Sequence, residues 1–272
     1  MPFNIYDNSF IVNLRSQLGC QFYDTYLGCI MYADDILLLS SSVIKLQRML
    51  DMCSSVGNEL EIKFNSAKSK CISIGPMRSL KLAPVSINGS EIQWVEKVKY
   101  LGLTLVAGKV FAIDLSETRR KFFVSVNVIL SKCQHCSDIV KLNLVETHCL
   151  PVLLYGLDCL NLPGHQLIEL NSWWNSVYRK IFGYHKWESV KELIFMLCRI
   201  DFYSLLNIRC MFFLKRLCIN SSISLTLSNL TMYVSASPEC KRLFSVCNAN
   251  MQSSFNQIRS VVWNSFQSRF GP

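Results

Sequence analysis

The hydrophobic pattern of the first hundred residues changes its period several times, which predicts short strands and helices in alternation. Two apolar runs, residues 27–31 and 36–39, flank a tight polar break, a pattern typical of a β-hairpin. Apolar residues then recur at intervals of three and four from Val43 to Val56. This spacing predicts a helix with an N-cap among serines 40–42 and a C-terminal stop at Gly57.

Shorter elements are predicted after this helix. Residues 60–64 alternate apolar and charged side chains like a half-exposed strand, and residues 71–74 form a second short apolar run. Asn88-Gly89 is the strongest short turn signal and predicts a hairpin between residues 85–87 and 92–94. Helices and strands in this order predict an α+β fold.

The pattern becomes mainly helical after residue 106. Helical spacing predicts helices at residues 166–182 and 201–219, as it does at residues 3–14 near the N-terminus. Residues 220–237 are rich in Ser, Thr and Asn, which predicts a linker, and residues 239–268 predict terminal helices.

Composition narrows the class of protein. Half of the residues are hydrophobic and 17% are charged, so a core is readily built. No apolar run reaches the roughly 18 residues of a membrane span, and the N-terminus lacks the pattern of a signal peptide. We therefore expect no membrane partner, no secretion and an intracellular location, in the cytoplasm or the nucleus.

Thirteen cysteines are interpreted as buried thiols in a reducing compartment. The alternative is a zinc site, because Cys133-Gln-His-Cys136 is followed by His148-Cys149. A second Cys-x-x-Cys motif is absent from the sequence, and the paired spacing typical of zinc sites is therefore missing.

The positive charge is unevenly placed. Residues 1–106 contain 10 Lys and Arg against 9 Asp and Glu, a net charge of +1. Residues 107–272 contain 18 Lys and Arg against 10 Asp and Glu, a net charge of +8. A basic second part favours a polyanionic partner such as nucleic acid.

Asp34 and Asp35 are the candidate chemistry of the first part. Two carboxylates buried between apolar strands would be costly, so we expect the turn to hold them at a surface. The simpler interpretation is a solvated turn; the functional one is a site for hard divalent cations such as Mg²⁺, which carboxylate oxygens bind. Two such ions about 3.5–4 Å apart can bind both the attacking and the leaving oxygens of a phosphoryl transfer.

Several motifs, in a fixed order, resemble reverse transcriptases. Tyr32-Ala33-Asp34-Asp35 between apolar strands resembles the catalytic hairpin of these enzymes, and residues 31–40 resemble the non-LTR (LINE-type) retrotransposon group. Pro2-Phe3-Asn4-Ile5-Tyr6 resembles the end of the helix after the family's Gln-Gly motif. Asn65-x-x-Lys68-Ser69 and Lys99-Tyr100-Leu101-Gly102 match two later motifs, and residues 150–156 and 173–183 resemble the region after the palm.

The resemblance implies an architecture. Residues 1–106 would be the second half of a polymerase palm, consisting of a β-hairpin, a helix and antiparallel strands. Residues 107–219 would be a helical thumb or connection region, and residues 220–272 a linker with terminal helices. The fold class is thus α+β, with an incomplete palm followed by a mainly helical region.

The resemblance also implies a reaction and roles within it. The reaction is RNA-directed DNA synthesis with two Mg²⁺ ions, an RNA template, a DNA primer and deoxynucleotides. Asp34 would be the principal metal ligand and Asp35 the second, while Tyr32 and Ala33 would set the turn.

Further roles belong to later motifs. Lys68 would meet the leaving pyrophosphate, with Lys70 as a competitor for this role. The primer end would be positioned by Tyr100, Leu101 and Gly102. Arg179 and Lys180 would bind the nucleic-acid backbone; the alternative is that the cations of this helix are simply solvated.

The family's complete site has a third aspartate, from an earlier strand. Asp7 and Asp24 are the acids before the hairpin, and neither lies in the family's aspartate context. We therefore expect an N-terminally truncated reverse transcriptase, inactive alone, whose full-length form supplies the fingers and the missing aspartate. The alternative is a non-enzymatic relic or a co-opted nucleic-acid-binding protein with the same fold.

Overall fold

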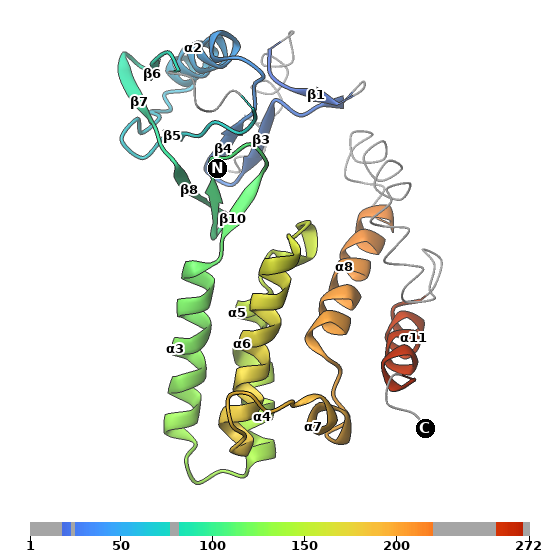
Figure 1. Cartoon of the computed structure of the whole chain (residues 1–272). Coiled ribbons are helices and arrows are strands. Elements are labelled where there is room, and N and C mark those ends of the chain that lie inside the picture. The colour runs from blue at the N-terminus through green and yellow to red at the C-terminus, as the bar shows by residue number, and fades with distance from the viewer. Residues whose placement is uncertain (1–17, 23–24, 77–81, 220–253, 269–272) are drawn as a thin grey trace. The chain divides into compact units, whose positions relative to one another are not determined.

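The computed structural model describes residues 18–22, 25–76, 82–219 and 254–268. The chain forms two compact units, residues 1–114 and 115–272 (Figure 1). The predicted helix at residues 3–14, Asp7, Asp24 and the predicted linker at residues 220–237 lie outside the described residues. Within the described ranges, no helix is both long and apolar enough to cross a bilayer.

Unit 1 (residues 1–114) combines one described helix, α2, with short strands in separate small sheets. These elements are β1 (Gln21–Phe22), β2 (Thr25–Tyr26), β3 (Cys29–Tyr32), β4 (Asp35–Leu38), α2 (Val43–Glu59), β5 (Lys70–Cys71), β6 (Val85–Ile87), β7 (Ser90–Trp94), β8 (Lys97–Tyr100), β9 (Leu103–Val106) and β10 (Ala112–Asp114). The sheets are β1-β2, β3-β4, β5-β7-β6 and β10-β9-β8. Their pairings are antiparallel except β5 with β7, which is parallel. The predicted α+β class is confirmed.

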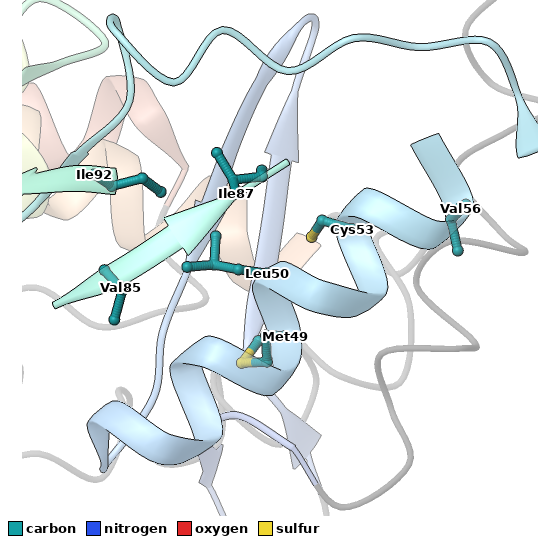
Figure 2. Packing of buried hydrophobic residues seen from close by; sticks show 7 residues of the cluster. All are labelled: Met49, Leu50, Cys53, Val56, Val85, Ile87 and Ile92. Atoms are coloured by element: carbon teal, nitrogen blue, oxygen red, sulfur yellow. The ribbon is translucent and has the colours of Figure 1, made fainter. Parts of the chain in front are cut away.

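The core of unit 1 lies between α2 and the β6–β7 hairpin. Figure 2 shows the buried side chains that meet there, namely Met49, Leu50, Cys53, Val56, Val85, Ile87 and Ile92. Gln47 connects α2 to β6 by hydrogen bonds, because its side chain donates to the Ser86 carbonyl at 2.9 Å and accepts from the Ser86 N–H at 2.8 Å. Burial of the Cys53 side chain raises the pKa of its thiol to about 12, so this thiol stays neutral at physiological pH.

The Asn88-Gly89 turn signal of unit 1 predicted its hairpin correctly. Asn88 and Gly89 connect β6 to β7 with φ values of 50° and 74°. Two successive positive φ values are the geometry of a type I′ turn, which Asn-Gly adopts at little cost. The Ser42 side chain accepts from the Lys45 N–H, which confirms the predicted N-cap of α2.

Three predictions for unit 1 were wrong in detail. Helix α2 continues through Gly57 to Glu59. Gly57 is needed instead for close packing, since a Cβ there would lie 2.8 Å from the Ile62 carbonyl oxygen. Residues 60–64 form no strand although their burial alternates as predicted, because no neighbouring strand pairs with them in the described structure. Of the strand predicted at residues 71–74, only Cys71 lies in β5, and Ile74 makes an isolated bridge to Gly108.

The described part of unit 2 (residues 115–272) is helical. Its elements are α3 (Ser116–Lys132), α4 (Asp138–His148), α5 (Leu150–Leu154), η1 (Leu157–Cys159), α6 (Gly164–Phe182), α7 (Lys191–Met196), α8 (Phe202–Ile219) and α11 (Phe255–Gln267). The helices predicted at residues 166–182 and 201–219 are confirmed within two residues. Unit 1 extends to residue 114 because β10 pairs with β9; the identities of residues 1–106, 107–219 and 220–272 as palm, thumb and linker stay predictions.

The core of unit 2 is built on the aromatic side of α6. Trp174 and Tyr178 are almost completely buried, and their rings meet edge to face at 5.6 Å. Phe122 of α3 packs against Trp174 at 6.4 Å. The tryptophans of this helix therefore stabilise the helical unit and are not available to a ligand.

A partly buried polar network links α4 to the segment before α8. The Arg199 Nε lies 2.9 and 3.0 Å from the two carboxylate oxygens of Glu146, and a second guanidinium nitrogen donates to the Asn143 side chain at 2.8 Å. The Tyr178 hydroxyl lies 3.5 Å from the same carboxylate. Burial, and then the Glu146 charge, raise the pKa of Tyr178 well above its ordinary value.

The cysteines correct one expectation. The side chains of ten of the thirteen are described, all as thiols outside disulfides, but only Cys53 and Cys149 among them are buried. Cys159 and Cys198 are exposed, and the other six have intermediate exposure. The zinc alternative gains no support, since no group of three potential metal ligands occurs among the described residues.

Candidate functional site

The two acidic residues lie at the tip of the β3–β4 hairpin, which we call the acidic hairpin (residues 29–38). Tyr32 pairs with Asp35, so the connecting turn is only Ala33 and Asp34. Ala33 has a φ of 52°, a region that a small residue enters more easily than a bulky one. The prediction that both acids lie in the turn is thus corrected: Asp34 is in the turn and Asp35 begins β4.

The alternation of side chains gives this hairpin an inner and an outer face. Met31 and Ile36 are paired and pack against the core under α2. Because successive residues of a strand point to opposite faces, Tyr32 and Asp35 lie on the outer face. Tyr32 is 64% exposed, and Asp34 and Asp35 are exposed as well. The apolar strands therefore fix the hairpin while its acidic tip stays open to solvent.

The base of the acidic hairpin is closed by backbone contacts. The Leu39 N–H donates to the Gly28 carbonyl at 2.7 Å, and the Cys20 N–H donates to the Leu39 carbonyl at 2.9 Å. The Tyr26 ring packs directly over Gly28, where a Cβ would lie 2.5 Å from the ring. Glycine at this position allows the preceding β1–β2 hairpin to pack against the base.

A second tight turn carries the predicted primer-positioning residues. Leu101 and Gly102 connect β8 to β9 with φ values of 44° and 82°, again as in a type I′ turn. The preceding Tyr100 is partly buried. Burial, and then the Asp35 charge, raise the pKa of Tyr100. Two motifs that are 65 residues apart in the sequence thus lie within electrostatic reach of each other in unit 1.

The Asn65-x-x-Lys68-Ser69 motif forms a compact polar turn. The Asn65 side chain accepts from the Lys68 N–H at 3.1 Å, and the Asn65 carbonyl accepts from the Ser69 N–H at 3.0 Å and its hydroxyl at 2.9 Å. Asn65 and Ser69 therefore fix the backbone on both sides of Lys68, whose side chain is exposed.

Lys70, the competitor of Lys68, has a partner within the chain. Its ammonium group donates to the Gln93 side chain at 2.8 Å, alongside the parallel pairing of β5 with β7. Gln93 is a residue that the sequence analysis did not identify, because it lies on a distant strand and no local motif includes it.

The acidic tip meets the chemical requirement for Mg²⁺ in part. Mg²⁺ is commonly bound by one or two carboxylates and completes its shell with water and substrate phosphates. Asp34 and Asp35 supply two exposed carboxylates. In the described ranges, no third Asp, Glu, His or Cys joins them in a metal-binding group. The acidic tip thus fits a Mg²⁺ ion whose remaining ligands come from water and substrate phosphates.

Comparison with known proteins finds a similarity that covers this region. Residues 2–105 match the family model of reverse transcriptase (RNA-dependent DNA polymerase). The reverse transcriptase match includes the acidic hairpin, the Asn65–Ser69 turn and the β8–β9 turn, and it ends before unit 2. No curated protein matches the chain.

Arg179 and Lys180, the predicted backbone contacts, lie in the last turn of α6. The Arg179 Nε donates to the Glu188 carbonyl at 2.9 Å. The exposed Lys180 ammonium lies 3.2 Å from the Asn127 side-chain oxygen and 5.5 Å from the centre of the Phe123 ring. Their contacts with nucleic acid stay predictions.

The segment that follows these cations was not predicted as a candidate site. Residues 183–190, the α6–α7 loop, expose Tyr184, Lys186 and Trp187. The signal was present in the sequence, since aromatic and basic residues alternate directly after the helix-ending Gly183.

Proposed function

We propose that unit 1 contains part of the nucleotidyl-transfer site of an RNA-directed DNA polymerase of the non-LTR (LINE-type) retrotransposon group. The observation that carries this proposal is the acidic hairpin, with two exposed carboxylates at a two-residue turn and Tyr100 within electrostatic reach of one of them. The family match to residues 2–105 supports the reaction class. The assignment to the non-LTR group rests on the sequence motifs around residues 31–40.

Asp34 would be the principal ligand of Mg²⁺ and Asp35 the second. When bound, such ions neutralise the charge that develops on the reacting phosphate oxygens. The apolar inner face of the hairpin fixes the strands that carry both carboxylates, and Ala33 at the turn leaves space for a primer end.

Lys68 is the better candidate to meet the leaving pyrophosphate. Its side chain is exposed next to a turn that Asn65 fixes, whereas the Lys70 ammonium already bonds to Gln93. A lysine ammonium would stabilise the charge of the leaving group or supply a proton to it. Tyr100, Leu101 and Gly102 would position the primer end.

Residues 107–216 would bind the RNA template and DNA primer through the phosphate backbone. Unit 2 contains 17 Lys and Arg against 9 Asp and Glu, a net charge of +8. Binding of this kind gives affinity without sequence choice and weakens with salt.

Two-metal transfer by the family's site requires a third carboxylate. Since neither Asp7 nor Asp24 lies in the family's sequence context for that aspartate, we propose that the 272-residue chain does not polymerise by itself. The same observation favours a second candidate function, a co-opted nucleic-acid-binding protein that keeps the fold without turnover.

Terbium luminescence tests the metal site directly. Tb³⁺ is a hard cation that prefers oxygen ligands, and a nearby aromatic ring excites its emission. Tyr32, two residues before Asp34, is exposed at the same tip. We expect tyrosine-excited Tb³⁺ emission that Mg²⁺ displaces and that a deoxynucleoside triphosphate strengthens, because substrate phosphates complete the shell.

The decisive variant is Asp34→Ala, which should abolish the displaceable emission, whereas Asp35→Ala should weaken it. Glu91→Ala is the matched control, since Glu91 is an exposed acid on the neighbouring β6–β7 hairpin. If Asp34→Ala and Glu91→Ala both leave the emission unchanged, the acidic hairpin is not a metal site and the proposed polymerase function is lost.

A further inference from the structure

Trp187 is a large apolar side chain left in solvent. It is 82% exposed, whereas Trp173 and Trp174 of the same unit are 6% and 1% exposed. The His185 ring lies parallel to it, with an interplanar angle of 4° and a centroid separation of 5.4 Å. The Trp187 side chain thus belongs to a stacked pair of rings at the surface of the loop.

The α6–α7 loop is fixed by several hydrogen bonds. Gly183 ends α6 with a φ of 73°, and the Tyr184 N–H donates to the Arg179 carbonyl at 3.0 Å. The Glu188 carboxylate accepts from the His185 N–H, and the Glu188 carbonyl accepts from the Arg179 Nε at 2.9 Å. The loop therefore presents its rings from a defined backbone, which lowers the entropy cost of binding.

The charges around the rings favour an anionic partner. Lys186 lies between His185 and Trp187 in the sequence, and Lys180 and Lys191 are exposed at the two ends of the loop. Glu188, the acid within the loop, is already used by the His185 N–H. A partner that offers flat rings and negative charge together is a single-stranded nucleic acid, whose bases stack on aromatic side chains while its phosphates meet lysines.

We infer that the α6–α7 loop is a base-stacking platform, on which Trp187 stacks an unpaired base of single-stranded nucleic acid. This inference deepens the proposed function, because it rests on the chain binding nucleic acid. It adds a specific contact to the bases, which the phosphate-binding lysines do not make.

The test compares two oligonucleotides of about twelve nucleotides, within the site size of single-strand binders. One is oligothymidylate, and the other is an abasic strand with the same phosphates and no bases. Binding is measured by fluorescence anisotropy at low salt in EDTA, which makes it independent of the acidic hairpin. Trp187→Ala should lower the affinity for oligothymidylate roughly 5- to 150-fold, the range for one base–aromatic stack, and leave the abasic strand unaffected.

Two further variants make the result specific. Trp187→Phe keeps a flat ring and should retain most of the affinity. Ile168→Ala removes another exposed apolar side chain, 64% exposed on the preceding helix α6, and should change neither affinity. Unfolding curves of the four proteins should coincide, because the removed side chains carry little packing.

Intrinsic fluorescence gives an independent measure. Oligothymidylate should quench the emission of the exposed Trp187, and the abasic strand should not. The inference is overturned if Trp187→Ala leaves the ratio of the affinities for oligothymidylate and the abasic strand unchanged. It is also overturned if Trp187→Phe lowers the affinity for oligothymidylate as much as Trp187→Ala does. If neither strand binds at low salt, both this inference and the proposed nucleic-acid binding fail, while the terbium site is judged separately.

Discussion

Arg179 has two possible roles that one set of variants can separate. The sequence predicts that it contacts a phosphate, whereas its Nε–H bonds to the Glu188 carbonyl at 2.9 Å in a partly buried position. We predict that Arg179 acts mainly as a positioning residue for the α6–α7 loop. Replacing it should then affect the binding of bases more than the binding of phosphates.

The size of the effect follows from this contact. A hydrogen bond from a charged donor contributes about 1.5–3 kcal/mol when partly buried. Two other hydrogen bonds of the loop do not involve the Arg179 side chain, namely Tyr184 to the Arg179 carbonyl and His185 to Glu188. Without the Arg179 side chain, we therefore expect the loop to keep its conformation for part of the time. The apparent affinity scales with the fraction of molecules whose loop has the conformation of the structure. If this fraction falls to about 0.1–0.5, the affinity for oligothymidylate falls roughly 2- to 10-fold.

Arg179→Lys is the decisive variant, because lysine keeps the charge for a phosphate but cannot reproduce the Nε–H geometry. We expect Arg179→Lys to weaken oligothymidylate binding and to leave abasic binding and its salt dependence unchanged. Lys180→Ala is the matched control, from the adjacent exposed cation. Lys180→Ala should weaken the binding of both strands. It should also reduce the slope of log affinity against log salt concentration by about 0.7, the value for one single-strand phosphate contact.

The measurement is the same anisotropy titration at several salt concentrations. Two results together would refute the reasoning. Arg179→Lys would bind both strands like the unmodified protein, and Arg179→Ala would lower the affinity for both strands equally and reduce its dependence on salt. Arg179 would then be the phosphate contact that the sequence predicts.

Two further predictions concern catalysis and stability. With an RNA template, a DNA primer, deoxynucleotides and Mg²⁺, the 272-residue chain should give no primer extension; extension that disappears with Asp34→Ala would contradict this. A double-mutant cycle on Glu146 and Arg199, measured by urea unfolding, should give a coupling of about 1–2 kcal/mol, because these side chains are only 22% and 35% exposed. The more exposed Glu117–Lys121 pair on α3 is the control and should give about 0.3–0.5 kcal/mol. An equal coupling in both cycles would show that the Glu146 network adds nothing beyond a surface ion pair.

Local chemistry determined much of the fold. The two apolar runs around Asp34 and Asp35 predict the acidic hairpin, and the structure adds its apolar inner face, because side chains on a strand alternate between two faces. Asn88-Gly89 predicts its own turn, since these two residues adopt positive φ readily. The spacing along α6 likewise predicts the helix, and the tertiary structure uses its aromatic side as core.

Predictions failed where a long-range partner decides the outcome. Residues 60–64 carry a strand pattern and have the predicted burial, but alternation specifies which side chains are buried and supplies no partner strand. Cys71 lies in a strand because β7, more than 20 residues later, pairs with β5. The C-terminus of α2 follows the packing of Gly57 against residues 62–64 rather than the helix-stopping tendency of glycine.

The sequence by itself therefore determined the α+β class, the two longest predicted helices of unit 2 and the Asn88-Gly89 hairpin, and it supplied the candidates for the site, because motif and period are local properties of a chain. Tertiary structure alone brought Tyr100 close to Asp35 and gave Lys70 its partner Gln93. It also bonded Arg179 to the loop that exposes Trp187. The contacts of Tyr100 and Lys70 depend on how distant segments pack, and the energy that selects them comes from burial and hydrogen bonding that no short stretch of sequence contains.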